Sequence, residues 1–162
     1  MSAPQPIKPS NRNLDIMNKI IIYLVLAVVA SGCVSSSFNK PEINTDTEEI
    51  EITGNSSEQV EIWIKNTYSQ QAASFHLNIT EPEVAEVKDS TGQSISELDM
   101  GQAAAGSSTV KKVIIVQGNP QALGSLNSGT DQLSLNVTAD TSANLTEEQK
   151  FNEKNLTVTV QR

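Results

Sequence analysis

Cys and His, the side chains that most often carry chemistry, each occur once in this chain of 162 residues, as Cys33 and His76. One cysteine excludes an internal disulfide. One Cys with one His cannot supply the several sulfur and nitrogen ligands of a zinc or copper site. A Ser-His nucleophile would have to use His76 as its base, and no two carboxylates stand out as an acid/base couple. We therefore expect no catalytic site, no metal centre and no cofactor.

Two other stretches invite a chemical interpretation. The run NTDTEEIE, residues 44–51, concentrates carboxylates, and Ca²⁺ prefers several carboxylate oxygens. Its spacing matches no calcium loop, so we interpret it as a solvated acidic linker. The Gly-containing stretch at residues 118–129 lacks the Gly-Lys-Ser/Thr ending of a phosphate-binding loop, and we interpret it as an ordinary loop.

The candidate modification sites are five Asn-x-Ser/Thr sequons, each on the polar face of a predicted strand or in a turn. A glycan is therefore sterically allowed at each of them, and an archaeal or other N-glycosylating host would modify some. The alternative is plain polar Asn on a β surface. The five asparagines are Asn55, Asn78, Asn136, Asn144 and Asn155.

Trp63 and Tyr68 are the candidate binding residues, because exposed aromatic side chains are enriched at recognition sites. Trp63 lies on the polar face of a predicted strand, beside Glu61 and Lys65, and Tyr68 follows the end of that strand. Together they would form a platform for a sugar or a protein. The alternative is that Trp63 packs under a loop or an edge strand.

Cys33 lies at the end of a signal-like segment. Lys19 precedes an apolar run of 11 residues, Ile20–Ala30, and the small residues Ser31 and Gly32 lead into the cysteine. A basic residue, a short apolar run and a small-residue site make a secretory signal. The run is shorter than the roughly 20 apolar residues that a membrane span needs.

The stretch ASGC resembles the lipobox of prokaryotic surface lipoproteins, with Ala30 where that family most often has Leu, and we expect an archaeal host. The resemblance covers Met17–Cys33. It implies a diacylglyceryl-type lipid on the Cys33 thiol and cleavage before this residue; two acyl chains give a stable anchor. The alternative is an uncleaved N-terminal anchor helix with an inert Cys33. Both place the rest of the chain outside the cytoplasmic membrane.

From residue 48 onward, apolar residues alternate with polar ones, which is typical of strands with one buried face. A more continuous apolar run at residues 110–118 predicts an inner strand, and residues 144–151 predict one helical turn capped by Asn144 or Thr146. We expect an all-β, antiparallel sandwich of seven or eight strands, preceded by an N-terminal signal or anchor helix. The strand order resembles that of an immunoglobulin-like domain. The other predicted strands are residues 48–53, 59–67, 73–80, 83–90, 132–140 and 155–162.

Within the immunoglobulin-like class, the sequence resembles the CARDB type of prokaryotic surface proteins. The carrying stretches are EIWIKNTYSQQAASFHLNIT, MGQAAAGSSTVKKVIIVQG and the closing LNVTAD and KNLTVTVQR. The resemblance spans most of residues 48–161. It implies a module for adhesion, spacing or assembly at a cell surface, and it implies no catalytic residue.

These observations divide the chain into four parts. Residues 1–16 are Pro-rich and polar, and we expect either a disordered extension or an upstream start, with Met17 as the alternative to Met1. Residues 17–32 are the lipoprotein signal segment. Residues 33–47 are a flexible, serine-containing spacer. Residues 48–162 form the sandwich.

The charge of the chain limits its partners. The formal net charge is −8, and the residues from Cys33 onward carry 8 Lys and Arg against 18 Asp and Glu, a net charge of −10. Nucleic-acid binding needs basic side chains that replace the counterions of phosphates, so we expect none.

The function that we predict is non-catalytic. We expect an extracellular lipoprotein on the outer face of the cell membrane, held by its lipid or its N-terminal helix. Its sandwich would be an adhesion, assembly or structural module for an unknown protein or glycan partner of the envelope. The alternative is a carbohydrate- or ion-binding accessory lipoprotein that uses exposed Trp63 and Tyr68.

Overall fold

The computed structural model describes residues 40–162. The predicted signal segment, Cys33 and the first part of the predicted spacer lie outside the described residues. Within residues 40–162 no helix has the length and apolar character needed to cross a membrane. The described elements are β1 (Glu42–Thr45), β2 (Glu49–Thr53), β3 (Ser57–Lys65), β4 (Ala73–Thr80), β5 (Ala85–Lys88), β6 (Glu97–Ala103), β7 (Thr109–Gly118), β8 (Ser128–Asp140), α2 (Glu147–Lys150) and β9 (Phe151–Gln161).

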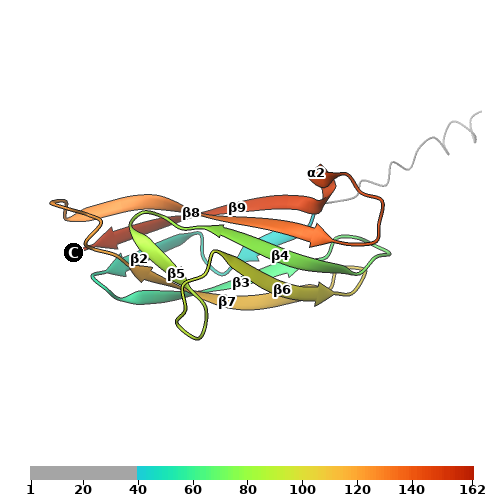
Figure 1. The fold of residues 1–162 in the computed structure, drawn as a ribbon, viewed down its shortest axis with the longest axis horizontal. Helices are drawn as coiled ribbons and strands as arrows, with labels where there is room; N and C mark the ends of the chain where they lie inside the picture. Colours follow the sequence, from blue (N-terminus) through green and yellow to red (C-terminus); the bar gives the residue numbers. More distant parts are fainter. Residues whose placement is uncertain (1–39) are drawn as a thin grey trace, which may run out of the picture. The chain divides into compact units, whose positions relative to one another are not determined.

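The strands form two facing sheets, as Figure 1 shows. Sheet A has the order β1-β3-β7-β5, and sheet B has the order β2-β9-β8-β4-β6. The predicted two-sheet sandwich is therefore confirmed. One expectation is wrong: β2 pairs with β9 in parallel, whereas the other strand pairs are antiparallel. The cause is that the chain crosses from sheet A to sheet B after β1, so β2 runs beside the last strand in the same direction.

The strand order matches that of an immunoglobulin-like domain. In the lettering of immunoglobulin strands, β1 and β2 are the two halves of the first strand, which is split between the sheets. Strands β1, β3, β7 and β5 of the first sheet then correspond to A, B, E and D. Strands β9, β8 and β4 of the second sheet correspond to G, F and C, and β6 is an added edge strand beside C. One feature departs from that plan. Along the chain, β5, the edge strand beside β7, comes before β6, the edge strand beside β4. Ile95 N–H donates to Val87 O at 3.0 Å and Ile79 N–H to Ser96 O at 2.8 Å, so the crossing segment bonds to both sheets.

The core lies between the two sheets and includes the apolar positions that the alternation predicts. The pattern is confirmed on the whole of β4 and on the C-terminal parts of β3, β8 and β9, where every second side chain is buried. Burying an aliphatic or aromatic side chain contributes about 1.5–3 kcal/mol each, which is why a disulfide is not needed to hold the layers together. The largest buried side chains include Phe75, Ile62, Ile64, Leu77, Ile114, Leu133, Leu135 and Leu156.

Two strands were not predicted. β1 lies in the stretch that we interpreted as a flexible spacer and acidic linker, so the described residues of that stretch belong to the sandwich. Its single buried apolar side chain, Ile43, gives little sequence signal. β6 contains a bulge opposite Phe75 and His76, and Gly101 has a φ of 90°. The bulge shifts the alternation within β6, and this hides the strand pattern.

The domain has distinct ends. At one end Thr67 Oγ1 donates to Lys40 O at 2.9 Å and Asn152 Nδ2 donates to Pro41 O at 2.6 Å, beside α2. The predicted helical turn is confirmed there, and its cap is Thr146. At the other end Arg162 N–H donates to Asn127 O at 2.9 Å. Figure 1 shows α2 and the C-terminus at opposite ends of the sandwich.

Candidate interaction surfaces

The outward side chains of sheet A form the first candidate surface, which we call the Trp63 face. Trp63 on β3 is the register partner of Lys111 on β7, and Glu61 is the partner of Val113. Lys111 Nζ lies 5.5 Å from the centroid of the Trp63 ring and 2.6 Å from Glu61 Oε1. Cation–π contacts of this kind contribute about 0.5–1 kcal/mol at exposed sites. Trp63 is half-buried among these neighbours, while Val113 is 40% exposed.

Tyr68 is not part of this surface, and the prediction that it is exposed beside Trp63 is wrong. Its side chain is 2% exposed, and its hydroxyl donates to Gln149 O at 2.9 Å. Burial raises the pKa of Tyr68 to about 12. Strand β3 ends at Lys65, and the chain then turns inward, so the period-two alternation no longer tells which side chains face solvent.

The inward turn depends on Asn66, which the sequence reasoning did not single out. Asn66 is fully buried, and its Oδ1 accepts a hydrogen bond from Tyr68 N–H at 2.9 Å. Its Nδ2 donates to Gln71 O at 2.8 Å, Ala103 O at 3.2 Å and Ala104 O at 2.9 Å. An Asn directly after a strand commonly starts such a side-chain-supported turn, and this signal could have found it.

The outward side chains of sheet B form the second candidate surface, which we call the sequon face. It carries Asn78, Asn136 and Asn155, with Asn78 and Asn136 directly opposite each other on β4 and β8. Asn78 and Asn155 are exposed and Asn136 is half-buried, while the sequon residues Asn55 and Asn144 lie exposed outside the strands. All five sequon asparagines therefore lie where the sequence predicts them, on outward strand positions or between strands; whether they carry glycans stays a prediction.

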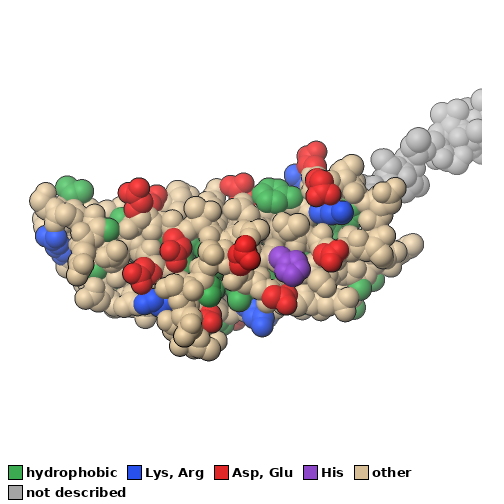
Figure 2. Space-filling view, in the orientation of Figure 1, with side chains coloured by type: hydrophobic (Ala, Val, Ile, Leu, Met, Phe, Trp, Pro, Cys, Tyr) green, Lys and Arg blue, Asp and Glu red, His purple; other side chains and the backbone are tan. Residues whose placement is uncertain are grey.

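The sequon face is also acidic. Its outward positions include six carboxylates and neither Lys nor Arg among the residues of β2, β4, β6, β8 and β9. Asp and Glu side chains are spread along the surface in Figure 2. His76 belongs here, exposed and opposite Asp99 on β6. Within residues 40–162, no group of three or more His, Cys, Asp or Glu could hold a metal ion. The six acids are Glu49, Glu51, Glu97, Asp99, Asp140 and Glu153.

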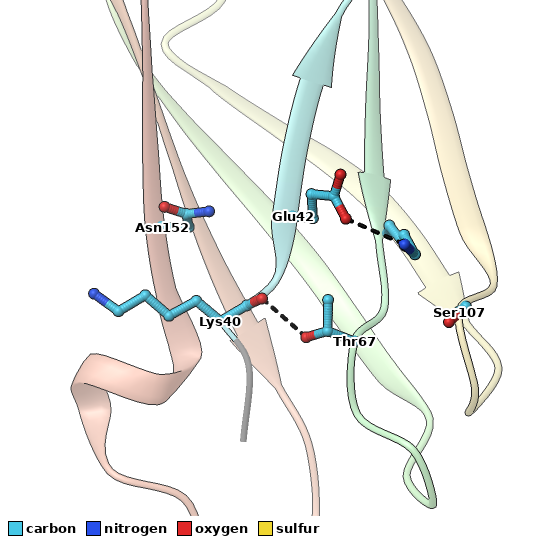
Figure 3. Close-up of a pocket in the computed structure, with 6 residues that line it drawn as sticks. Lys40, Glu42, Thr67, Ser107 and Asn152 are labelled. Carbon is cyan, nitrogen blue, oxygen red and sulfur yellow. Dashed lines mark hydrogen bonds and ion pairs between the residues drawn. The ribbon is translucent and has the colours of Figure 1, made fainter. Parts of the chain in front are cut away.

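A hollow of about 330 Å³ opens between β1 and β9 at the end of the sandwich that carries α2 (Figure 3). Lys40, Thr67 and Asn152 line it together with the ion pair between Glu42 and Lys65, whose Nζ and Oε2 are 3.2 Å apart. A hydrogen bond from Asn44 and the nearby Lys65 ammonium lower the pKa of the Glu42 carboxyl. The lining is polar and internally paired, so this hollow offers no evident chemistry.

A second hollow, of about 520 Å³, lies toward the C-terminal end between the β4–β5 and β7–β8 connections. Leu126 is 60% exposed on its rim and Leu123 is buried beneath it. Asp131 Oδ2 accepts from Glu83 N–H at 2.7 Å, which lowers the pKa of Asp131. The Asp131 carboxylate therefore holds the β4–β5 connection in place by accepting a backbone hydrogen bond.

No family model matches this chain, and no curated protein matches it either. Solved structures with similar folds include the CooA pilin subunit from enterotoxigenic Escherichia coli, at 13% identity and a TM-score of 0.42, over 75% of this chain and 98% of that one.

Two further solved structures are similar. The Salmonella enterica SafA pilin in complex with the SafB chaperone is matched at 6% identity and a TM-score of 0.41, over 74% of this chain and 54% of that chain. A CARDB domain from Pyrococcus furiosus, solved in complex with di-metal ions, is matched at 17% identity and a TM-score of 0.35, over 78% and 99%. At these identities the likeness concerns the sandwich fold alone.

Proposed function

We propose that this protein is a lipoprotein anchored to the outer face of the cell membrane, whose immunoglobulin-like sandwich is a non-catalytic interaction module. The single observation that carries the anchor is the stretch ASGC, which ends at Cys33. Only six residues separate Cys33 from Lys40, and Lys40 lies at the end of the sandwich that carries α2, opposite the C-terminal end.

Under this proposal, the short connection determines which end of the sandwich faces the membrane. Seven residue steps from Cys33 to Lys40 span at most about 25 Å when fully extended. A lipid on Cys33 therefore keeps the end with α2 close to the bilayer. The opposite end, with the β2–β3 turn and the β7–β8 connection, points away from the membrane and is free to meet an envelope partner.

The distribution of cations supports the same orientation. Six of the eight Lys and Arg within residues 40–162 lie in the half of the sandwich that contains α2, and the remaining two are Lys88 and Arg162. A basic side chain near an anionic membrane surface contributes about 1 kcal/mol of attraction. Five of the six are paired with a Glu, so this placement offsets part of the acidic charge at this end and weakens its repulsion from an anionic membrane without creating a basic patch. The six cations are Lys40, Lys65, Lys111, Lys112, Lys150 and Lys154.

The alternative, a sugar platform built from two exposed aromatics, loses half of its support because Tyr68 is buried. Trp63 remains on a surface, but its ring already contacts Lys111. No contact in residues 40–162 favours a sugar over a protein partner at this position.

The proposal is tested by the intact mass of the protein extracted from native membranes. We expect a polypeptide that starts at Cys33 and carries a lipid increment. The Cys33→Ser variant should lack the lipid and retain its signal segment, whereas the matched Ser36→Ala variant should behave as the wild type. A wild-type mass that begins at Met1 or Met17 without lipid rejects the lipoprotein, and recovery in the cytoplasmic fraction rejects the surface location.

A further inference from the structure

The two outer surfaces of the sandwich differ in charge in a way that the fold itself does not require. On the Trp63 face, three acids and three lysines occupy the outward positions of β1, β3, β7 and β5. Each lysine is already paired: Lys65 with Glu42 at 3.2 Å, Lys111 with Glu61 at 2.6 Å, and Lys88 with Glu86 at 3.3 Å. The Trp63 face is therefore electrically neutral.

The same face carries apolar side chains between its ion pairs. Trp63 and Ile115 are half-buried and Val113 is 40% exposed, on the two neighbouring strands β3 and β7. Apolar and aromatic side chains that remain exposed in the middle of a sheet gain free energy when a partner covers them. The Trp63 face thus combines exposed apolar side chains with ion pairs whose charges cancel.

The rest of the described domain is acidic. Residues 40–162 carry a net charge of −10, and the sequon face has six carboxylates with neither Lys nor Arg at its outward strand positions. Like charges placed against each other across an interface cost several kcal/mol. Two copies of this chain therefore repel each other through the sequon face and can approach through the Trp63 face.

We propose that a second copy of this chain packs on the Trp63 face, so that the protein forms a face-to-face dimer of sandwiches. The two-fold axis runs parallel to the strands, between β3 and β7. This axis places β3 of each copy over β7 of the other. Because Trp63 and Lys111 are register partners, Trp63 of one copy then meets Lys111 of the second copy. Glu61 likewise meets Val113 of the second copy. The surface is thus self-complementary, as an isologous interface requires.

The direction of the axis rests on the proposed function. An axis parallel to the strands puts both Lys40 residues at the same end of the dimer, and both lipid anchors then enter the same membrane. An axis perpendicular to the strands would put them at opposite ends. Confinement to one membrane raises the effective concentration of the second copy, so a modest apolar contact suffices for association.

The first test uses the full chain in native membranes with a photo-crosslinking amino acid in place of Gln59 or of Gln132. Both glutamines are exposed, Gln59 on the Trp63 face and Gln132 on the sequon face, so they form a matched pair. We expect a dimer-sized product from position 59, attached to β7 of the second copy near Ile115, the register partner of Gln59. We expect none from position 132.

The second test adds a charge at Val113 to the chain that carries the crosslinker at position 59. Val113→Glu faces Glu61 of the second copy and should lower the crosslinked fraction about tenfold or more. Val113→Lys introduces an attraction to the same Glu61 and should stay within about twofold of the starting chain. The control Gln132→Glu adds the same negative charge on the opposite face and should leave the product unchanged.

Each contrary outcome overturns the dimer. These outcomes are the absence of a dimer-sized product from position 59, attachment to a different protein, attachment to β3 instead of β7, and equal losses for Val113→Glu and Val113→Lys. Failure of the lipid anchor is read separately, because the intact mass and the membrane fractionation report it whether or not the crosslink forms.

Discussion

The backbone N–H of Tyr68 donates to the side-chain oxygen of Asn66 at 2.9 Å, and this contact ties the β3–β4 loop into the end of the sandwich. The Asn66 amide nitrogen meanwhile donates to three carbonyl oxygens: one in the β3–β4 loop, one at the last residue of β6 and one in the connection from β6 to β7. One buried side chain therefore joins two loops that are far apart in sequence. A buried polar group that satisfies its partners in this way is costly to remove.

We expect Asn66→Ala to lower the free energy of unfolding by about 3 kcal/mol, because it leaves buried carbonyl and N–H groups without a partner. The measurement is urea denaturation of the full chain. Asn44→Ala is the control: Asn44 is half-buried and its Nδ2 donates to Glu42 Oε1 at 3.1 Å, so its loss should stay within about 0.5 kcal/mol. Equal effects of the two substitutions would contradict the role assigned to Asn66.

Tyr68→Phe should lower the free energy of unfolding by about 1 kcal/mol at neutral pH, since it removes the hydrogen bond to Gln149 O. The variant should also change how the free energy of unfolding decreases at alkaline pH. Burial raises the pKa of folded Tyr68 from 10.0 to about 12. The unfolded state therefore loses the Tyr68 proton at a lower pH than the folded state does. The contribution of this group to the free energy of unfolding is complete below pH 10 and is lost as the pH rises toward 12.

The measurement is urea denaturation between pH 8 and pH 12. We expect a steeper alkaline loss in the wild type than in Tyr68→Phe. Tyr23 is present in both proteins and cancels in the comparison. Parallel alkaline limbs would mean that the Tyr68 hydroxyl is as accessible as in the unfolded chain.

Gly118→Ala should destabilise the domain by about 3 kcal/mol. A Cβ at this position would lie 2.5 Å from Gly54 O and 2.8 Å from Ile52 Cγ2, so the end of β7 and the β2–β3 turn would have to separate. The control Gly129→Ala meets the Cδ2 end of Leu123 at 2.6 Å, which can rotate away, and should cost about 1 kcal/mol or less. A thermal melt of both variants gives the comparison, and a larger effect at Gly129 would refute it.

Asn78 and Asn136 should not both carry a glycan in one molecule. They are direct partners on β4 and β8, and the Cβ atoms of such a pair are about 5 Å apart, too close for two attached sugar chains. If the host glycosylates this protein, glycopeptide masses that separate the two sequons should add up to at most one occupied site per molecule. Asn55 and Asn144 lie outside the strands and provide the comparison, because nothing prevents their simultaneous use.

The parts of the fold that were predicted from sequence are the stretches in which one face of a strand is buried over several successive alternations. β4 shows this clearly, since Phe75, Leu77 and Ile79 alternate with exposed polar residues. Burial on one side imposes a period of two, and this period is visible in the sequence without knowledge of the partner strand.

The parts that were missed lack such a period. β1 buries one apolar side chain and holds its place by pairing with β3, which no local pattern reveals. β6 changes register at its bulge. Tyr68 was misplaced because the chain turns inward after β3, and that turn depends on contacts from Asn66 to the distant residues Ala103 and Ala104. Long-range contacts of this kind are not encoded in a short stretch of sequence.

The parallel pairing of β2 with β9 has a consequence for the order of events in the cell. β9 lies between β2 and β8 in sheet B, and it is the last strand that the structure describes. Sheet B therefore stays in two pieces until β9 has been synthesised, and β2 cannot reach its native pairing before then. Under the proposed export from the N-terminus, the domain would remain incompletely folded until β9 has been made. Sheet B would then be completed on the far side of the membrane, when the eleven residues of β9 insert between β2 and β8.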